Sequence, residues 1–429
     1  MAPDSPSGSL GAVTVGDVRQ DPPPRAFGSL RHRNFRLFIS GQFVSLCGTW
    51  IQTVAQGWLV YKLSNSAFQV GLVSTLGSLP VLLFTLYGGA VADRVNKHRW
   101  IMLLQFLMIF PVLALAIMVQ IGRVTVMSVM IAAVILGILN AFEVPARQAF
   151  VVDMAGKGDL MSAIAINSSI FNLSRIIGPS IAGILISTVG IAACFYANAA
   201  SFLAVVGGLM LVRIPAASAE PPPTGRTGRL WEGLRYVWSE PWPRALMIMS
   251  GTLSVFGFAF ITMLPVFASE ALGVAAAGYG GLLSAVGVGA SAAALFVAGF
   301  GHKLRRERTI LIAGMLFGLS LILGAVSQYY WLALALLTLA GTAMVLNNVL
   351  TNTLLQTSAP DELRGRVMGV YSFMILGLSP FGSLQAGFVA EHLGVRIAIA
   401  SGGTICLLVA AGVAYRMWSE SVPVRLSVQ

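Results

Sequence analysis

Twelve apolar runs follow one another along this 429-residue chain, and each is long enough to cross a lipid bilayer as a helix. A hydrocarbon core about 30 Å thick is crossed by roughly 20 helical residues. The runs fall at 35–61, 68–92, 100–120, 124–148, 160–188, 190–212, 244–268, 278–300, 309–328, 331–356, 366–390 and 396–416. Backbone polar groups must be hydrogen-bonded in hydrocarbon, which favours helices. With 56% hydrophobic and 10% charged residues, the sequence predicts an all-α polytopic membrane protein with twelve transmembrane helices.

The basic residues are distributed unevenly between the two sides of the expected membrane. The net charge is +11, but the chain carries no groove-reading or base-stacking element, which argues against a nucleic-acid partner. Of the 27 Lys and Arg residues, only Lys62, Arg123 and Arg396 fall in the loops of one side, and Arg175 falls inside a span. The others lie in the two tails and in the alternate loops. The positive-inside rule therefore predicts that both termini are cytoplasmic.

The two halves of the chain resemble each other. Gly89 matches Gly299 and Pro179 matches Pro380, in sequences that recur in the same order about 200 to 210 residues apart. Such repeats are typical of transporters built from two bundles. We expect a disordered cytoplasmic tail at 1–34, pseudo-symmetric six-helix bundles at 35–212 and 244–416, and a second cytoplasmic tail at 417–429. The linker at 213–243 is expected to carry a short amphipathic helix on the inner membrane face, in RLWEGLRYVWSE.

The loop between the second and third spans carries a motif. Its sequence, GAVADRVNKHR from Gly89 to Arg99, resembles the signature loop of the major facilitator superfamily, G-x-x-x-D-R-x-G-R-R. Asn96 replaces the usual glycine, and His98 replaces a basic residue. Because Asn tolerates a left-handed backbone conformation, we expect the loop to form despite this replacement. The resemblance implies the major facilitator fold.

The same resemblance implies a cytoplasmic gate. In that superfamily the signature loop pairs with the start of span 11 when the inner side is closed. Here Asp93, Arg94 and Arg99 would pair with the segment that contains Asp361 and Arg364. The alternative is that these charges serve membrane topology alone.

Several further stretches narrow the resemblance within the superfamily. FRLFISGQFVSLCGTWIQ, PARQAF and LSRIIGPSIAG are similar to a group of bacterial exporters that includes enterobactin and macrolide efflux proteins. Gly178 and Pro179 with Gly183 also resemble the fifth-span motif of drug:proton antiporters, although only one glycine of its terminal pair is present. The resemblance implies export across a bacterial inner membrane in exchange for protons, by a protein expected to be a monomer.

Glu143 is the acidic residue that lies plainly inside a span, and ionisable groups in hydrocarbon are costly enough to suggest function. Arg147 follows it at i+4, a spacing that suits an ion pair, and Pro145 removes one helical hydrogen bond between them. A partly desolvated carboxylate beside a cation can exchange a proton. We therefore select Glu143 and Arg147 as candidates for proton coupling. The alternative is a static pair that stabilises the inner gate.

Arg175 lies about 22 Å from the cytoplasmic end of span 5, close to mid-membrane. On a helical wheel it shares one stripe with Asn172 and Pro179, opposite an isoleucine-rich stripe. Arg175 could recognise an anionic or carbonyl group of a substrate, or hold a proton-relay carboxylate. It could instead brace the helix structurally, bonded to backbone carbonyls and Asn172.

Uncharged polar residues recur at helical spacing in two further spans. They include Gln42, Gln52 and Gln56 in span 1 and Asn348 and Asn352 in span 10. Together with Asn140, Asn172 and Arg175, they are candidates to line a substrate cavity. The alternative for each is an ordinary hydrogen bond between helices. As a set they favour an amphipathic substrate over a highly charged one.

These features predict a secondary active transporter and not an enzyme. No phosphate-binding loop is present, and the His and Cys residues lack metal-ligand spacing, so we expect no ATP hydrolysis, cofactor or metal. The expected partners are a small-molecule substrate such as a drug-like compound or siderophore, protons and the lipid bilayer. Two alternatives remain: an importer or facilitator of a metabolite or lysolipid, and a non-transporting scaffold, receptor or scramblase.

Overall fold

The computed structural model describes residues 28–212 and 230–419, and every regular element in these ranges is helical. The elements of the first half are η1 (Gly28–Arg31), α1 (Arg33–Ser64), α2 (Ala67–Ala92), α3 (Lys97–Gln120), α4 (Val126–Thr188) and α5 (Ile191–Met210). Those of the second half are α6 (Leu230–Ser239), α7 (Pro241–Thr252), η2 (Leu253–Gly257), α8 (Ala259–Val266), η3 (Phe267–Ala271), α9 (Ala276–Phe300), η4 (Gly301–Lys303), α10 (Arg306–Val326), α11 (Tyr330–Ser358), α12 (Asp361–Ser372), η5 (Phe373–Gly377), α13 (Ser379–Leu393) and α14 (Val395–Ser419).

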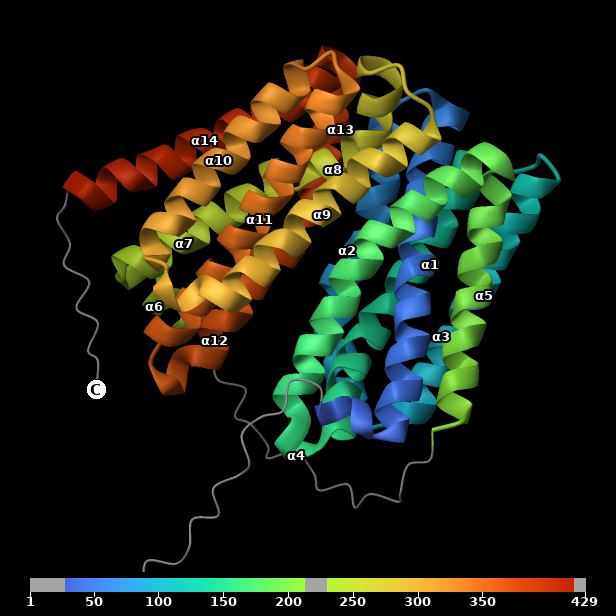
Figure 1. Ribbon diagram of the computed structural model, residues 1–429, viewed down its shortest axis with the longest axis horizontal. Helices are drawn as coiled ribbons and strands as arrows, with labels where there is room; N and C mark the ends of the chain where they lie inside the picture. Colours follow the sequence, from blue (N-terminus) through green and yellow to red (C-terminus); the bar gives the residue numbers. More distant parts are fainter. Residues whose placement is uncertain (1–27, 213–229, 420–429) are drawn as a thin grey trace, which may run out of the picture.

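Helix α4 contains two membrane-length arms, Val126–Met154 and Asp159–Thr188. A straight helix of 63 residues would be about 95 Å long at 1.5 Å per residue, roughly three times the thickness of a bilayer core. Figure 1 shows both arms within the same bundle, with their junction at its lower end. The first arm continues to Met154, beyond the predicted end of the fourth span at 148, and the residues between the predicted spans 124–148 and 160–188 are helical.

Eleven segments of the described chain are long and apolar enough to cross a membrane. The predicted first span is the exception, although α1 is a helix of 32 residues. Its hydropathy is lowered by polar residues that are buried in the protein and do not face lipid; Gln42 and Gln52, for example, are 2% and 6% exposed. Helix α1 is therefore less apolar than the other membrane-length helices because some of its buried side chains are polar.

The predicted terminal and linker segments fall partly outside the described residues. Residues 28–34, expected to belong to the disordered tail, are ordered: Ser29 is buried, and its backbone N–H donates to Ser162 Oγ at 3.3 Å. In the linker, α6 packs on α12, where Glu232 pairs with Arg366. Residues 1–27, 213–229 and 420–429 lie outside the described chain.

The two halves form two bundles, α1–α5 and α6–α14, that meet at the upper end of Figure 1 and diverge toward the lower end. Glycines allow backbone contact where they meet. A Cβ atom on Gly71 would lie 2.5 Å from the carbonyl oxygen of Ser383, and one on Gly280 would lie 2.4 Å from that of Pro179. Small residues of this kind let membrane helices approach closely. We call this end of the molecule the sealed end.

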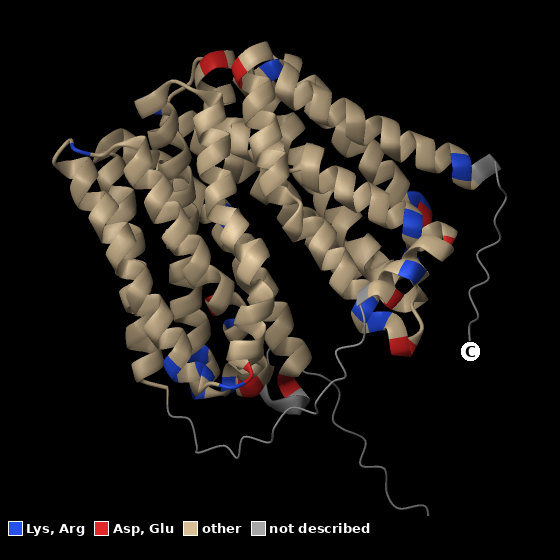
Figure 2. Ribbon diagram, turned by 180° about the vertical axis from the view of Figure 1, so that it is seen from behind, with Lys and Arg blue, Asp and Glu red and all other residues tan. Residues whose placement is uncertain are grey.

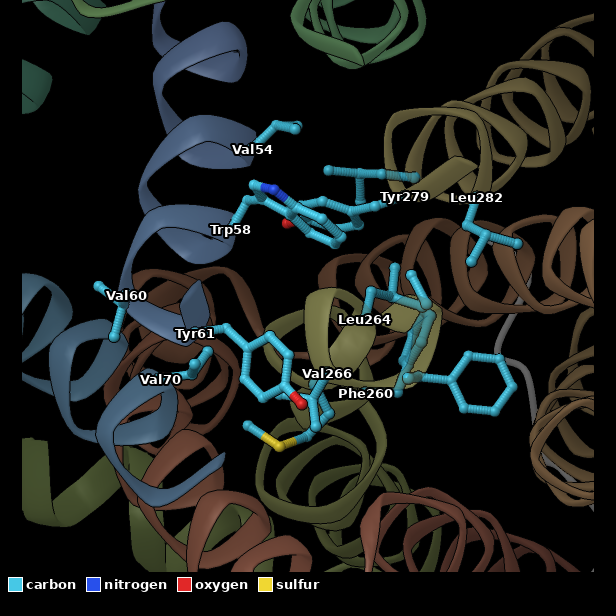
Figure 3. Packing of buried hydrophobic residues seen from close by; sticks show 14 of the residues in the cluster. Val54, Trp58, Val60, Tyr61, Val70, Phe260, Leu264, Val266, Tyr279 and Leu282 are labelled. Atoms are coloured by element: carbon cyan, nitrogen blue, oxygen red, sulfur yellow. The ribbon is translucent and has the colours of Figure 1, made fainter. Parts of the chain in front are cut away.

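Polar and aromatic contacts reinforce the sealed end. Glu391 of α13 accepts a hydrogen bond from the Phe68 backbone N–H at the start of α2, at 3.1 Å. Tyr61 of α1 donates to Glu270 of η3 at 2.8 Å. Figure 3 shows Trp58 of α1 face to face with Tyr279 of α9, with their ring centroids 6.2 Å apart. These contacts join the bundles where the loops carry few Lys or Arg residues.

The opposite end carries most of the Lys and Arg residues (Figure 2), and we call it the basic end. Among the residues that the structure describes, no hydrogen bond or ion pair joins the two bundles there. The space between the bundles therefore faces the basic end.

We predict that Gly71→Ala weakens the sealed end, because the added methyl group would clash with the backbone of α13. Spin labels at Val189→Cys and Leu393→Cys, exposed positions of the two bundles at this end, should then report longer distances by double electron–electron resonance. The background would lack the three native cysteines. Gly207→Ala is the matched control, because a Cβ there meets no atom within 4 Å. An unchanged distance distribution in Gly71→Ala would contradict the proposed role of this contact.

Candidate functional site

A cavity of about 420 Å³ lies between the bundles and is formed mainly by the N-terminal one. Its polar lining includes Gln42, Ser45, Thr49, Gln52, Thr53, Gln56, Ser74, Gln105, Asn140, Glu143, Arg147, Asn198 and Thr262. Its apolar lining includes Leu46, Val60, Val70, Val73, Met108, Leu136, Phe171, Phe202, Ile261 and Tyr279. A mixed lining of this size suits an amphipathic small molecule.

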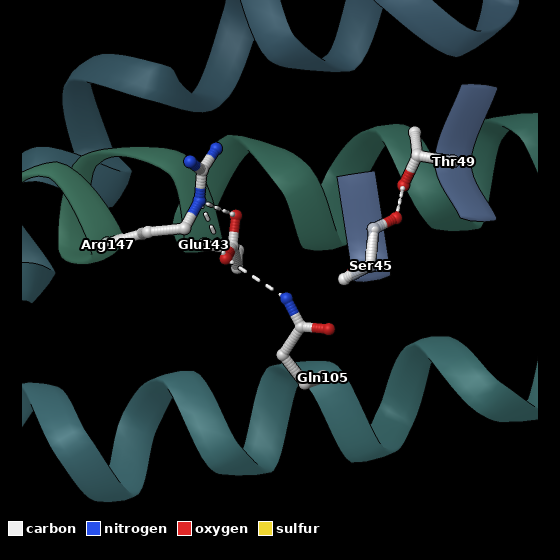
Figure 4. Close-up of polar contacts among 5 residues, drawn as sticks. All are labelled: Ser45, Thr49, Gln105, Glu143 and Arg147. Carbon is white, nitrogen blue, oxygen red and sulfur yellow. Dashed lines mark hydrogen bonds and ion pairs between the residues drawn. The ribbon is translucent and has the colours of Figure 1, made fainter. Parts of the chain in front are cut away.

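Glu143 and Arg147 lie at the wall of this cavity, one helical turn apart on the first arm of α4 (Figure 4). Arg147 Nε donates to both carboxylate oxygens of Glu143, at 3.1 and 3.2 Å. Gln105 of α3 donates its Nε2 to Glu143 Oε1 at 3.1 Å. The Glu143 side chain is only 3% exposed and that of Arg147 16%. The expected i,i+4 pair is thus present, and a neutral amide from a second helix completes it.

The polar face of α1 forms the facing wall of the cavity. Gln42, Gln52 and Gln56 all line it. Gln52 Oε1 accepts from Asn198 Nδ2 of α5 at 2.6 Å, so one of the three is also bonded between helices. Gln42 Oε1 is buried and has no hydrogen-bond partner among the described residues. Asn140 lines the cavity too, while its Nδ2 donates to the Leu136 carbonyl one turn earlier at 2.8 Å.

Arg175 does not line the cavity. Its side chain is 9% exposed and lies over the ring of Trp50, with 5.7 Å between the guanidinium carbon and the ring centroid. No hydrogen bond or ion pair of the described chain reaches its guanidinium, and Nε is buried without a partner. Asn172, expected as a possible partner, instead donates to the Ser168 carbonyl at 2.9 Å and is absent from the cavity lining.

The second arm of α4 packs too closely on its neighbours for Arg175 to reach the cavity. A Cβ on Gly178 would lie 2.4 Å from Cβ of Trp50, and a Cβ on Gly287 of α9 would lie 2.8 Å from the carbonyl oxygen of Arg175. The helical wheel placed Arg175 on a stripe with Pro179, and both residues are buried. That interior stripe faces α1 and α9, however, and not the open cavity.

Asn348 and Asn352 of α11 also lie outside the cavity lining. The Asn348 carbonyl accepts from the Tyr371 hydroxyl of α12 at 3.1 Å, and Asn352 Oδ1 accepts from Gln356 Nε2 at 2.7 Å. The cavity is asymmetric in this arrangement, since the C-terminal bundle contributes little more than Ile261, Thr262 and Tyr279.

The predicted gate residues lie at the basic end and do not pair across it. Asp361 pairs with Arg364 of its own helix at 2.5 Å. Among the described residues no ion pair joins these two to Asp93, Arg94 or Arg99. Such pairing is expected only when the basic end is closed, and here the bundles are apart.

Asn96 of the signature loop differs from expectation. Its φ and ψ are −67° and 102°, an extended and not a left-handed conformation. Its Oδ1 accepts from the Arg99 backbone N–H at 3.1 Å and so caps the start of α3. Asn96 can therefore stand in place of the usual glycine because its side chain caps the N-terminus of α3.

Four functional candidates were not identified from the sequence: Gln105, Asn198, Glu270 and Glu391. The first two are isolated polar residues in apolar spans, a signal that could have identified them. The two glutamates lie at span ends, where sequence alone does not distinguish an interbundle contact from a solvated charge.

Comparison with known proteins identifies the family of this chain. The family model described as transmembrane secretion effector matches residues 25–423. The chain is 29% identical to the multidrug efflux pump Tap of Mycolicibacterium fortuitum, over 81% of this chain and 87% of that protein. It is 26% identical to the staphyloferrin A transporter of Staphylococcus aureus, over 87% and 94%. It is also 26% identical to the enterobactin exporter EntS of Escherichia coli, over 88% and 92%.

Solved structures support the fold. An inward-facing, unoccupied bacterial homologue of the human lysosomal transporter Spinster superimposes with a TM-score of 0.71 at 14% identity, covering 91% of this chain and 99% of that one. The nucleoside transporter NupG gives a TM-score of 0.67 at 14% identity, covering 90% and 98%. The chain therefore belongs to the transmembrane secretion effector family of major facilitator transporters, which are membrane carriers of small molecules and not enzymes.

Proposed function

We propose that this transporter exports an amphipathic small molecule in exchange for protons, by alternating exposure of the cavity to the two sides of a bacterial inner membrane. The observation that carries this proposal is the buried pair of Glu143 and Arg147 at the wall of a cavity that is sealed at one end. Two relatives, a multidrug efflux pump and an enterobactin exporter, support export as the direction of transport.

Glu143 is the group proposed to carry the proton. Its carboxylate is almost fully buried, and as an anion it is compensated by Arg147 and Gln105. Protonation would remove the charge that holds Arg147, so the arginine would become free to interact with a substrate or with another helix. Because a cation without its counter-ion is costly in a buried site, proton binding and rearrangement around Arg147 are coupled.

The nature of the substrate is inferred from the cavity. Amide and hydroxyl groups of α1 lie on one side, and aliphatic and aromatic groups such as Val70, Val73 and Phe202 lie on the other. A molecule with one polar and one apolar face would satisfy both walls. Drug-like compounds and siderophores both include molecules of this type.

The orientation of the protein in the membrane is inferred from the distribution of its Lys and Arg residues. We propose that the basic end faces the cytoplasm, with both termini there, because Lys and Arg are retained on the inner side of bacterial membranes. The cavity would then be open inward and sealed outward. Division into two six-helix bundles joined by a cytoplasmic linker, and action as a monomer, belong to the same proposal.

The alternative is import or facilitated passage of a metabolite or lysolipid. It is distinguished from proton-coupled export by measuring how the rate and direction of substrate movement depend on the proton gradient. The alternatives of another class, a non-transporting scaffold, receptor or scramblase, do not agree with membership of a transporter family.

We also propose that Arg175 recognises an anionic group of the substrate. It is a buried cation without a bonded partner, held where α4 packs on α9 at the sealed interface. Ser284 of α9 donates to the Ile176 carbonyl at 2.9 Å in the same contact. When the sealed end opens, α4 and α9 must separate, and this separation would uncover Arg175.

Glu143→Gln is predicted to abolish proton-driven transport while preserving the fold, because an amide keeps the shape of the carboxyl but cannot release a proton. Everted vesicles with an acid interior, a fluorescent pH probe and a panel of drugs and siderophores would measure proton release on substrate addition. Glu240→Gln, which removes a carboxylate at the start of α7, is the control and should behave as wild type. Wild-type proton release from Glu143→Gln would refute the coupling role.

Arg175→Gln is predicted to weaken binding of an anionic substrate roughly 10- to 100-fold, since a hydrogen bond to a charged group contributes about 1.5–3 kcal/mol. Arg175→Lys should retain part of the affinity because it keeps the charge. The measurement is the dissociation constant of the purified protein for whichever compound wild type transports. Arg123→Gln, an exposed loop position, is the charge-matched control. Equal affinities in Arg175→Gln and wild type would instead assign Arg175 a bracing role.

A further inference from the structure

A second hollow, of about 770 Å³, lies on the C-terminal bundle away from the substrate cavity. Its apolar walls come from three helices and include Trp242 of α7, Ile312 and Met315 of α10, and Ala414 and Tyr415 of α14. None of these residues lines the cavity between the bundles. The hollow is therefore a separate feature, which we call the lateral groove.

The lateral groove exists because α10 and α14 diverge. They touch closely at Gly318, where a Cβ would lie 2.5 Å from the carbonyl oxygen of Gly403. They are still in contact at Gly314, where a Cβ would lie 3.1 Å from Cβ of Ala410, and beyond it they separate toward the free end of α14 (Figure 1). The small side chains of Ala411 and Ala414 leave the intervening space unfilled.

The rim of the lateral groove is charged. Arg305 and Arg308, both exposed, lie there together with Glu307. Within the described chain, none of these three side chains makes a hydrogen bond or ion pair. Arg305 immediately precedes α10, whose first backbone N–H groups also favour an anion. The rim carries a net positive charge with unused donors.

The groove is placed for a lipid. Ile312 is 58% exposed and Tyr415 76% exposed, so its walls continue into the outer surface of the bundle, where acyl chains would lie. Helix α9 begins at the sealed end and α10 begins just after α9 finishes, so the two arginines belong to the basic end, where the headgroups of one leaflet would lie. Basic pockets between membrane helices on the inner side bind anionic headgroups. An apolar trough beneath a cationic rim matches a molecule with one phosphate and long hydrocarbon chains.

We propose that the lateral groove binds one anionic phospholipid. Arg305 and Arg308 hold its phosphate, and an acyl chain lies along Ile312, Met315 and Ala414. This site is independent of the transported substrate and of proton coupling.

The test is lipid titration of the detergent-purified transporter by native mass spectrometry. Phosphatidylglycerol should bind with higher affinity than phosphatidylcholine of the same acyl chains. Arg305→Gln/Arg308→Gln should weaken phosphatidylglycerol binding roughly tenfold or more, because two cationic contacts to one phosphate are lost. Arg31→Gln/Arg36→Gln removes two exposed arginines from the same end of the other bundle, and it should bind as wild type does.

A second variant tests the apolar part of the groove. Ala414→Trp fills the space between α14 and α10 without changing charge, and it should reduce phosphatidylglycerol binding while leaving the thermal unfolding midpoint near that of wild type. Equal phosphatidylglycerol affinity in wild type and Arg305→Gln/Arg308→Gln would overturn the proposal. So would unimpaired binding in Ala414→Trp, or displacement of the lipid by excess inorganic phosphate, which would indicate a simple anion site.

Discussion

Close backbone packing of the two bundles at the sealed end is the interaction on which the remaining structure depends. Between membrane helices there is little hydrophobic driving force, because lipid tails are as apolar as the side chains, so association relies on close contact and hydrogen bonds. Gly71 and Gly387 provide that contact between α2 and α13, and Gly280 packs on Pro179 between α9 and α4. Among the residues that the structure describes, the bundles are thereby held together at the sealed end. Because contact is made at the sealed end, the cavity lies between the bundles and faces the basic end.

The cavity explains an otherwise unfavourable feature of the chain, the polar character of α1. A helix with three glutamines along its length is poorly suited to face lipid, but it is stable where these side chains meet other helices or an aqueous cavity. The same reasoning applies to Glu143, which is tolerated because Arg147 and Gln105 satisfy its oxygens. Several polar groups that would destabilise a membrane protein at its lipid surface lie here around one interior cavity.

The sealed end also places carboxylates where they can affect the equilibrium between the two conformations. Glu391 accepts hydrogen bonds at the start of α2, where the helix dipole favours an anion by about 0.3–1 kcal/mol. Glu270 accepts from Tyr61 of α1. Both carboxylates belong to the C-terminal bundle, and both accept hydrogen bonds from helices of the N-terminal bundle. Opening of this end must break these bonds together with the glycine contacts.

The sequence predicted the helical class, the span positions and the pair of Glu143 with Arg147, because each depends on local length, composition or spacing. It could not predict which neighbour a buried side chain meets. Arg175 was correctly placed on the interior stripe of its span, yet the packing of α4 on α1 and α9 keeps it from the cavity. Asn348 and Asn352 are not part of the cavity lining in this arrangement, because the cavity is formed mainly by the N-terminal bundle. Gln105 became a candidate only through its contact with Glu143 on another helix.

The most direct test of alternating access is a reversible cross-link across the sealed end. Ser74 of α2 and Ser383 of α13 face each other with their Oγ atoms 3.3 Å apart, so Ser74→Cys/Ser383→Cys should form a disulfide upon oxidation. The background would lack the native cysteines. We predict that the oxidised protein still binds substrate in the cavity, with lower affinity because Arg175 stays covered, but does not transport it, and that a reductant restores transport. Undiminished transport by fully cross-linked protein would show that the sealed end need not open, and would contradict alternating access through this interface.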